Sequence, residues 1–400
     1  MRKNGVNREI QPIEGGICAP AGFQAGAVSC GICPEKSKDL AVILAQRRCP
    51  CACVYSTSKC TGAPIAVTKK HVKDGYAQAI LVNGGIANVF QKDGVRFCED
   101  VCTLMDKYCG VSRDEVVIAS TGKIGESLKK EPFEKGLQEM KKALGEGEVY
   151  GFGVAEAIAS ENESPKQVAF SFEIGDFVCK IGAVFKGSMQ ACPNMATTLA
   201  FLTTDVCIAP AMLQKALETE VRETLNMLDI DGVASPNDTV CILASGSAGN
   251  CRINALDSDY EKFSHALRRV LFSICKEIAK TETSKPFLCN VQKVKSKQIA
   301  RKIAKKLAGN TGIRKRIKTN QSPLDSALCI VTELCEEVEI NELCVSLRAG
   351  KNELVLMEDG KVFPFSKEYA TRICAAEEIE LCIVLNTGNF NAVAIGCVSR

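Results

Sequence analysis

Short apolar runs typical of β-strands alternate with amphipathic helical segments along this chain, and this alternation restricts the fold to mixed α/β architectures. The predicted strands include DLAVILA (39–45), AILVNGG (79–85) and TVCILASG (239–246), and the predicted helices span 94–109, 132–144 and 212–228. Gly145 follows the second helix at the position where helices commonly stop. The pattern therefore favours sheets covered by helices.

The composition changes after about residue 280, and the length of 400 residues suggests more than one domain. We therefore expect a larger domain over 1–280 and a smaller α/β domain over 281–400. The smaller domain is predicted to contain strands and hairpins around a short helix near 366–376, with a turn at Asp359 and Gly360.

A basic segment opens the smaller domain, because residues 291–318 hold 11 Lys or Arg and no acidic residue. A nucleic-acid or phosphate-binding patch is one interpretation. The stronger one is an amphipathic helix with a solvated basic face, since Ile299, Ile303 and Leu307 step by four and no aromatic residue is available for base stacking. A nucleic-acid partner is therefore not expected.

The 23 cysteines need an explanation other than disulfides. The first ten residues are polar and no apolar run reaches the ~18 residues of a membrane span, so we expect a cytoplasmic protein with reduced thiols. CGIC (30–33) and CPCAC (49–53) could supply four thiolates to zinc or an iron-sulfur cluster somewhere between Cys30 and Cys60. The favoured alternative is that they are small buried residues, like the helical stripe formed by Cys98, Cys102 and Cys109, and that no metal binds.

Only two histidines are present, and neither is expected to act as a catalytic base. His71 is predicted in an exposed turn and His265 on a helix surface. A nucleophile can instead be activated by its own α-amine when a threonine becomes the chain terminus. Self-cleavage before Thr197 would create such a terminus, and the preceding Ala196 is suitably small.

PNMATTLAFLTTD (193–205) resembles the self-processing junction of the ornithine acetyltransferase family (ArgJ type). Further matching segments occur in the same order along the chain: GGICAPAGFQAGAVSCGI (15–32), KDLAVI (38–43), NGGIAN (83–88), ASTGKIGE (119–126) and DIDGVASPNDTV (229–240). Together they cover nearly the whole chain. Four cysteines fall where relatives place small residues, namely Cys30, Cys51, Cys53 and Cys192.

This resemblance implies an αββα sandwich of the self-processing Thr-nucleophile type with a smaller C-terminal α/β domain. It implies cleavage between Ala196 and Thr197 into an α chain (1–196) and a β chain (197–400), which pair as heterotetramers. Thr197 would take the acetyl group of N-acetylornithine and pass it to glutamate in a ping-pong reaction of arginine biosynthesis. No cofactor is implied, and acetyl-CoA stays open as a co-substrate.

The resemblance also assigns the site residues. Thr121 and Gly122 match the pair that forms the oxyanion hole, Ser160 and Lys186 match substrate-binding positions, and Glu282, in KTETSK, is the best match to the glutamate of the family's DGEGATK-like motif.

Two hypotheses about activity follow. Relatives continue past the strand corresponding to AIGCV with a tail that carries an Asn and a terminal Thr as substrate ligands, whereas this sequence stops at Arg400. The first hypothesis is an active acetyltransferase of the arginine pathway. The second is a divergent paralogue that acts on another N-acyl compound or only binds one.

Overall fold

The computed structural model describes residues 10–160, 163–187, 198–230, 235–335 and 340–400. The chain divides into two compact units. The first comprises Met1–Glu220 and Val233–Val270, and the second comprises Val221–Gly232 and Leu271–Arg400. Residues 221–230 therefore pack with C-terminal residues, an association that no feature of the sequence indicated.

Nine strands form the sheet of the first unit, in the order β1-β6-β7-β8-β9-β3-β4-β5, with β2 paired to β3 outside this path. The long strand β3 joins the two halves, because Leu40–Leu44 pair with β4 and Cys51–Tyr55 pair with β9. The strands are β1 (Gln11–Ile13), β2 (Phe23–Val28), β3 (Leu40–Tyr55), β4 (Tyr76–Asn83), β5 (Val116–Ser120), β6 (Lys166–Ile174), β7 (Phe177–Lys186), β8 (Leu199–Thr204) and β9 (Thr239–Ala244).

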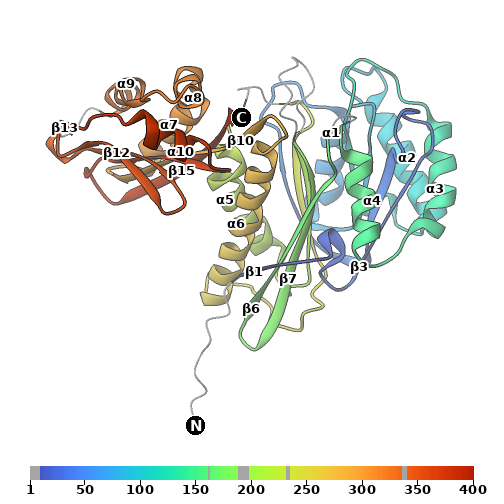
Figure 1. Cartoon of the computed structure of the whole chain (residues 1–400). Helices are drawn as coiled ribbons and strands as arrows, with labels where there is room; N and C mark the ends of the chain where they lie inside the picture. Colours follow the sequence, from blue (N-terminus) through green and yellow to red (C-terminus); the bar gives the residue numbers. More distant parts are fainter. Residues whose placement is uncertain (1–9, 161–162, 188–197, 231–234, 336–339) are drawn as a thin grey trace, which may run out of the picture. The chain divides into compact units, whose positions relative to one another are not determined.

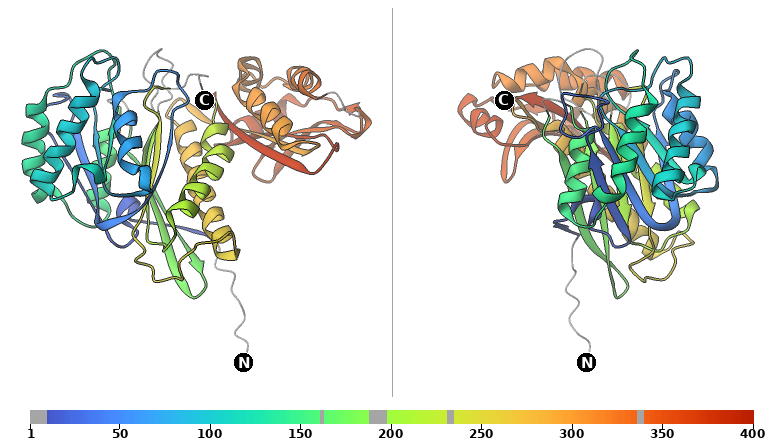
Figure 2. Two further views of the ribbon diagram at one scale, coloured as in Figure 1. Left: turned by 180° about the vertical axis from the view of Figure 1, so that it is seen from behind. Right: turned by 90° about the vertical axis from the view of Figure 1, so that its right-hand side faces the viewer.

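Helices cover the outer faces of both halves of this sheet (Figures 1 and 2). α1, α2 and α3 pack on the half formed by β2 to β5, whereas α6 packs on the other half, where Phe263 contacts Phe172 of β6. The helices are α1 (Ala63–His71), α2 (Gly94–Cys109), α3 (Lys130–Ala143), α4 (Glu148–Ile158), α5 (Pro210–Glu223) and α6 (Ser258–Ala279). The expected αββα layering is confirmed.

The core between the two halves of the sheet explains much of the cysteine usage. Cys49, Cys51 and Cys53 occupy alternate positions of β3 and all lie in this core, at 2%, 2% and 5% exposure. Side chains two residues apart on a strand share a face, so the period of two that the sequence shows places all three inside. The prediction that these three cysteines are small buried residues of the core is confirmed.

His71 differs from the sequence prediction, because it is buried rather than exposed in a turn. It is the last residue of α1, it is 7% exposed, and its Nδ1 lies 2.9 Å from the carbonyl oxygen of Val116. One helical turn separates it from the buried Val67, so both side chains face the sheet. The sequence analysis did not predict the helix α1, and His71 was therefore expected in a turn. His265 lies exposed on α6, as predicted.

The second unit is built on a six-stranded sheet in the order β13-β12-β11-β14-β10-β15. The strands are β10 (Ser284–Val294), β11 (Cys344–Ala349), β12 (Asn352–Glu358), β13 (Lys361–Val362), β14 (Ile379–Val384) and β15 (Phe390–Ser399), and the helices are α7 (Lys297–Gly309), α8 (Thr311–Lys318), α9 (Leu324–Leu334) and α10 (Lys367–Cys374). The predicted hairpin at Asp359–Gly360 joins β12 to β13, and the short helix predicted near 366–376 is α10.

The basic segment is helical, as predicted, and much of its charge is used within the second unit. Lys297 of α7 pairs with Glu223 at 2.7 Å, and Arg301 donates to the carbonyl oxygen of Arg222 at 2.8 Å. Arg314 of α8 donates to the carbonyl oxygens of Asp229 and Ile230. These contacts tie residues 222–230 to the C-terminal part of the chain and engage basic groups that a nucleic-acid surface would need.

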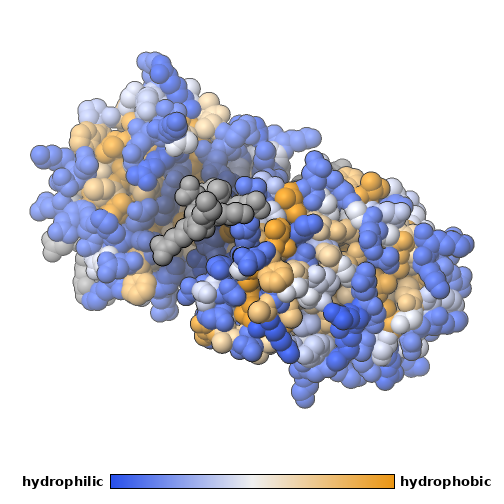
Figure 3. Space-filling view, turned by 90° about the horizontal axis from the view of Figure 1, so that it is seen from below, coloured by the Kyte–Doolittle hydropathy of each residue, from blue (hydrophilic) through white to orange (hydrophobic). Residues whose placement is uncertain are grey.

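The face seen in Figure 3 is mainly hydrophilic, with hydrophobic residues in several separated groups. Scattered apolar side chains of this kind are normal on a folded surface. None of the helices in the described ranges is long and apolar enough to cross a membrane.

Candidate active site

Strand ends from both halves of the first unit's sheet come together at one end of the sandwich. Lys186, the last residue of β7, pairs in register with Leu199, the first residue of β8, and Leu199 pairs with Thr239 at the start of β9. β5 ends at Ser120, beside Asn83 at the end of β4. Strand ends allow side chains to project beyond the sheet while the backbone stays held by its ladder.

Thr121 and Lys186 contact one another at this end of the sandwich. The Lys186 ammonium group donates to Thr121 Oγ1 at 3.0 Å, and both side chains are buried, with exposures of 5% and 1%. The Thr121 amide donates to the Asn83 carbonyl oxygen at 3.0 Å. Because Lys186 occupies a lone pair of the hydroxyl oxygen, the Thr121 hydroxyl proton can be donated to another acceptor.

Gly122 follows in a conformation that only glycine adopts easily, with a φ of +135°. A Cβ at this position would lie 2.0 Å from the carbonyl carbon and oxygen of Gly85. The amide of Lys123 donates to that same Gly85 oxygen at 2.8 Å. Within the described ranges the Gly122 amide has no hydrogen-bond acceptor. Adjacent residues therefore carry a hydroxyl donor and a backbone amide for which the described residues supply no acceptor.

Burial changes the titration of Lys186. It lowers the pKa of this ammonium group to about 8, and the nearby charge of Lys36 acts in the same direction while Glu163 opposes it. The low-dielectric surroundings disfavour the charged form, which is the usual cause of a depressed lysine pKa. Shifted titratable groups of this kind cluster at functional sites.

Ser160 lies just beyond α4, in a turn closed by Glu163. The Glu163 amide donates to the Ser160 carbonyl oxygen at 3.0 Å. Lys36, which sequence reasoning missed, donates to the carbonyl oxygens of Ala157 and Ala159 immediately before Ser160. The last turn of α4 contains no basic residue, so Lys36 supplies from a distant segment the cation that helix carbonyl ends favour.

Three further residues were predicted to belong to the site. Ala196 and Thr197 lie outside the described residues. Thr198, which follows them, donates its amide hydrogen to Asp238 Oδ1 at 2.7 Å. Glu282 belongs to the second unit, where it lies exposed between α6 and β10.

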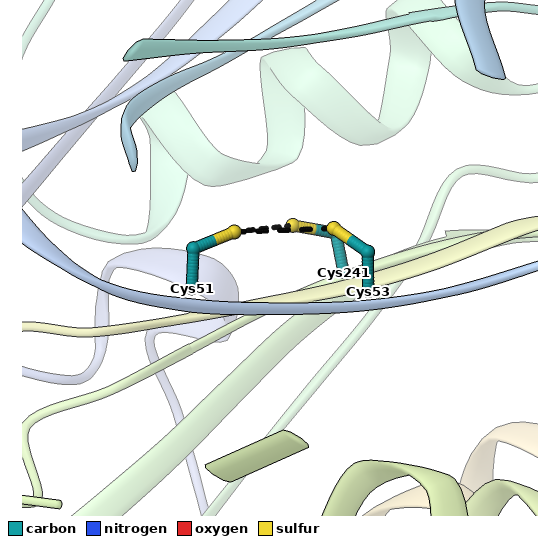
Figure 4. A group of neighbouring side chains, drawn as sticks. All are labelled: Cys51, Cys53 and Cys241. Carbon is teal, nitrogen blue, oxygen red and sulfur yellow. Dashed lines mark hydrogen bonds between the residues drawn. The ribbon is translucent and has the colours of Figure 1, made fainter. Parts of the chain in front are cut away.

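Cys51, Cys53 and Cys241 form a buried group of thiols, shown in Figure 4 with their sulfur atoms turned toward one another. Cys53 of β3 pairs directly with Cys241 of β9. The Cys51 sulfur lies 3.9 Å from that of Cys53 and 3.8 Å from that of Cys241. Burial is the largest cause of the raised pKa of Cys241, and hydrogen bonding to Cys241 is the largest cause of the raised pKa of Cys51. These shifts favour the neutral thiol at Cys51 and Cys241, whereas hydrogen bonds with Cys241 and Cys51 lower the pKa of Cys53 and favour its thiolate.

The predicted four-thiolate set is not assembled by the described residues. Cys30 lies instead in the core under α2 and α3, where its sulfur donates to Asp39 Oδ1 at 3.2 Å. The Cys33 amide donates to the other oxygen of Asp39 at 3.0 Å. The CGIC segment thus wraps around a buried carboxylate, and Cys241 joins Cys51 and Cys53 only because β9 pairs with β3.

The sequence is similar to known proteins over almost its entire length. A profile of the ArgJ family matches residues 24–398. The arginine biosynthesis bifunctional protein ArgJ of Symbiobacterium thermophilum is 32% identical over 395 residues, covering 96% of each chain. The protein of the same description from Lactococcus lactis is 32% identical, covering 97% of this chain and 96% of the relative. The crystal structure of ArgJ from Bacillus halodurans matches 47% of this chain and all of its own chain, with 26% identity and a TM-score of 0.43. By its profile match and its full-length relatives, this chain belongs to the ArgJ family.

Proposed function

We propose that this protein is an ornithine acetyltransferase of arginine biosynthesis, which transfers the acetyl group of N-acetylornithine to glutamate through an acetyl ester on Thr197. The bifunctional ArgJ relatives support this proposal. The observation that carries it is the hydrogen bond from Lys186 to Thr121, next to a Gly122 amide that has no acceptor in the described part of the chain. Two donors and a cation where these strand ends meet suit a reaction in which a carbonyl oxygen gains negative charge.

The first half-reaction forms the acetyl ester. The Thr197 α-amine accepts the hydroxyl proton while the hydroxyl oxygen attacks the acetyl carbonyl carbon. Negative charge collects on the carbonyl oxygen, where the Thr121 hydroxyl and the Gly122 amide would donate. Collapse of this intermediate breaks the bond to the ornithine nitrogen, which leaves with the proton held by the α-amine.

The second half-reaction reverses these steps with a new amine. The glutamate amine attacks the ester carbonyl carbon and loses a proton to the Thr197 α-amine. The bond to Thr197 then breaks, its oxygen regains the proton, and N-acetylglutamate leaves. We assign Lys186 and Ser160 to the substrate, with the Lys186 ammonium facing an α-carboxylate, and we keep Glu282 as a further substrate ligand. Acetyl-CoA is proposed as a second acetyl donor, as the bifunctional relatives suggest.

Self-cleavage between Ala196 and Thr197 completes the proposal, since it creates the α-amine. It gives chains 1–196 and 197–400, which we expect to assemble as heterotetramers in the cytoplasm. Residues 1–280 would carry the reaction and residues 281–400 the smaller domain.

Mass spectrometry of the purified protein tests the nucleophile. Fragments beginning at Met1 and Thr197 are expected, whereas Thr197→Ala should stay a single chain of 400 residues. Acid quenching after incubation with N-acetylornithine should leave one acetyl group on the fragment that begins at Thr197. Exchange of labelled acetyl between N-acetylornithine and glutamate then tests the substrates. A self-cleaved protein that is acetylated by another N-acyl compound, but not by N-acetylornithine, would favour the paralogue hypothesis.

The pH dependence offers a second test. The Thr197 α-amine must be neutral to accept a proton, and its usual pKa is about 8. Lys186 must be charged to attract a carboxylate, and its pKa is about 8. We therefore expect kcat/KM to rise and then fall with pH, with its maximum near 8. Lys186→Arg should flatten the falling limb, because arginine stays charged.

A further inference from the structure

The segment Ser235–Asp238 lies directly before β9 and is held by several hydrogen bonds, although the buried Oδ1 of Asn237 has no partner among the described residues. Ser235 donates its amide hydrogen to Asp238 Oδ2 at 3.0 Å. Ser56 donates its amide hydrogen to the Asp238 carbonyl oxygen at 2.8 Å and its hydroxyl to the Ser235 carbonyl oxygen at 2.5 Å. Such bonds hold a turn in one conformation, so its side chains can act as fixed attachment points.

Asn237 reaches from this segment to the oxyanion side of the site. Its side-chain amide nitrogen donates to the carbonyl oxygens of Ser120 at 2.9 Å and Ala87 at 2.6 Å, and the residue is 2% exposed. Two carbonyl acceptors require the NH2 group on this side, which settles the orientation of the amide.

The Ser120 carbonyl shares a planar peptide unit with the Thr121 amide, which donates to the Asn83 carbonyl oxygen at 3.0 Å. Asn237 and Asn83 therefore hold opposite sides of the peptide that leads to Thr121. The Ala87 amide donates to the Lys123 carbonyl oxygen at 2.9 Å, so the second acceptor of Asn237 belongs to the loop packed against Gly122.

Asp238, the next residue, reaches the chain on the other side of the site. Its Oδ1 accepts from the Thr198 amide at 2.7 Å, and the Thr239 amide donates to the Thr198 carbonyl oxygen at 3.1 Å. The Thr198 amide nitrogen is covalently bonded to the carbonyl carbon of Thr197. The contact with Asp238 therefore holds the residue that directly follows the proposed nucleophile in the chain.

We propose that Asn237 and Asp238 act as a pair of positioning residues, which keep the nucleophile at the correct distance from the oxyanion donors. Asn237 holds the peptide before Thr121, and Asp238 holds the amide of Thr198, the neighbour of the proposed nucleophile in the chain. Because the two residues are adjacent in sequence, a single rigid turn sets the separation of two groups that come from distant parts of the chain. This inference rests on the function proposed above, since the alignment affects the reaction rate only if Thr197 is the nucleophile.

Loss of this alignment should lower kcat, while KM for the substrate should change much less. A misplacement of about 1 Å can reduce a rate by about 100-fold. Asn237→Ala and Asp238→Ala are therefore expected to lower kcat for acetyl transfer by roughly 10- to 100-fold, with KM for N-acetylornithine changed less than about threefold. Self-cleavage, followed as a single-turnover rate after rapid refolding or synthesis, should slow in parallel.

Asp238→Asn provides the conservative variant. It keeps an oxygen acceptor for the Thr198 amide, so it should recover most of the rate lost in Asp238→Ala. Thr203→Val is the control, because it removes a buried hydroxyl that donates to the Ile17 carbonyl oxygen and contacts neither the Ser235–Asp238 segment nor the peptide before Thr121. We expect Thr203→Val to lower the melting temperature but to leave kcat unchanged.

These variants separate positioning from stability. An unchanged kcat in folded Asn237→Ala and Asp238→Ala would overturn the proposal. So would an equal loss of kcat in Thr203→Val at the same loss of melting temperature. Failure of the proposed function looks different, because the unaltered protein itself would then be uncut or would transfer no acetyl group to glutamate.

Discussion

Lys186→Met should stabilise the folded protein at pH 7 while reducing its activity. Lys186 is 5% exposed, and burial is the main reason that its pKa falls from 10.5 to about 8. This displacement corresponds to a penalty of roughly 3 kcal/mol for keeping the ammonium charged in the folded state below pH 8. The variant also loses the hydrogen bond to Thr121, worth about 1 kcal/mol. We expect a net gain of about 2 kcal/mol in the free energy of unfolding.

The sign of the pH dependence is specific to a lysine with a depressed pKa. Between about pH 8 and 10.5 the unfolded chain binds a proton that the folded chain has released, so the stability of the unaltered protein should rise with pH over this window. The advantage of Lys186→Met should therefore be largest at pH 7 and disappear toward pH 10.5.

Thermal unfolding at pH 7 and pH 10 measures this difference. Both proteins should carry Thr197→Ala, so that cleavage does not distinguish them. A gain of about 2 kcal/mol predicts a melting temperature higher by roughly 4–8 °C at pH 7. Lys92→Met, on an exposed lysine, is the control and should change little. A variant that is less stable at pH 7, or equally shifted at both pH values, would refute the assigned cost of burying Lys186.

Three further predictions concern other parts of the structure. Thr121→Val removes a proposed oxyanion donor and should lower kcat by about 100- to 1000-fold in acetyl-transfer assays. Thr203→Val is its control: it removes a buried hydroxyl that donates to the Ile17 carbonyl oxygen and should affect only the melting temperature. Gly122→Ala should lower the melting temperature far more than Gly125→Ala, because both glycines have positive φ but only Gly122 lacks space for a Cβ; equal effects would contradict this. Arg314→Met leaves the carbonyl oxygens of Ala308, Asp229 and Ile230 without this donor and should lower the free energy of unfolding by roughly 2–4 kcal/mol. Amide hydrogen exchange of residues 225–230 should become faster, and unchanged protection would argue against the anchoring role of Arg314.

Periodic segments were predicted well because their local pattern and their packing agree. α2 spans Gly94–Cys109, as its apolar stripe indicated, and β9 spans Thr239–Ala244 within the predicted strand. The helix predicted over 212–228 ends earlier, at Glu223, and a short 3-10 turn over Leu225–Met227 follows it. Stepping of leucines by three and four continues through such a turn, so periodicity alone could not locate the end.

Interactions between distant segments could not be predicted in this way. The site residues Thr121, Gly122 and Lys186 were found through resemblance, but nothing in their spacing indicated that the Lys186 ammonium donates to Thr121. Lys36 was missed because its acceptors lie more than 100 residues away. Asn237 was also missed, although it lies in a segment that resembled the family.

The sequence by itself determined the α/β class, the main helices and strands, the family, and the residue types available for acyl transfer, because periodicity and motifs are local properties of a chain. The tertiary structure decided which of those groups meet. Pairing of β7, β8 and β9 brings Lys186 and Thr198 to one end of the sandwich, and the turn before β9 joins these strand ends to the peptide before Thr121. Burial then gives Lys186 its lowered pKa. Contact and desolvation depend on the whole fold, so no local pattern could specify them.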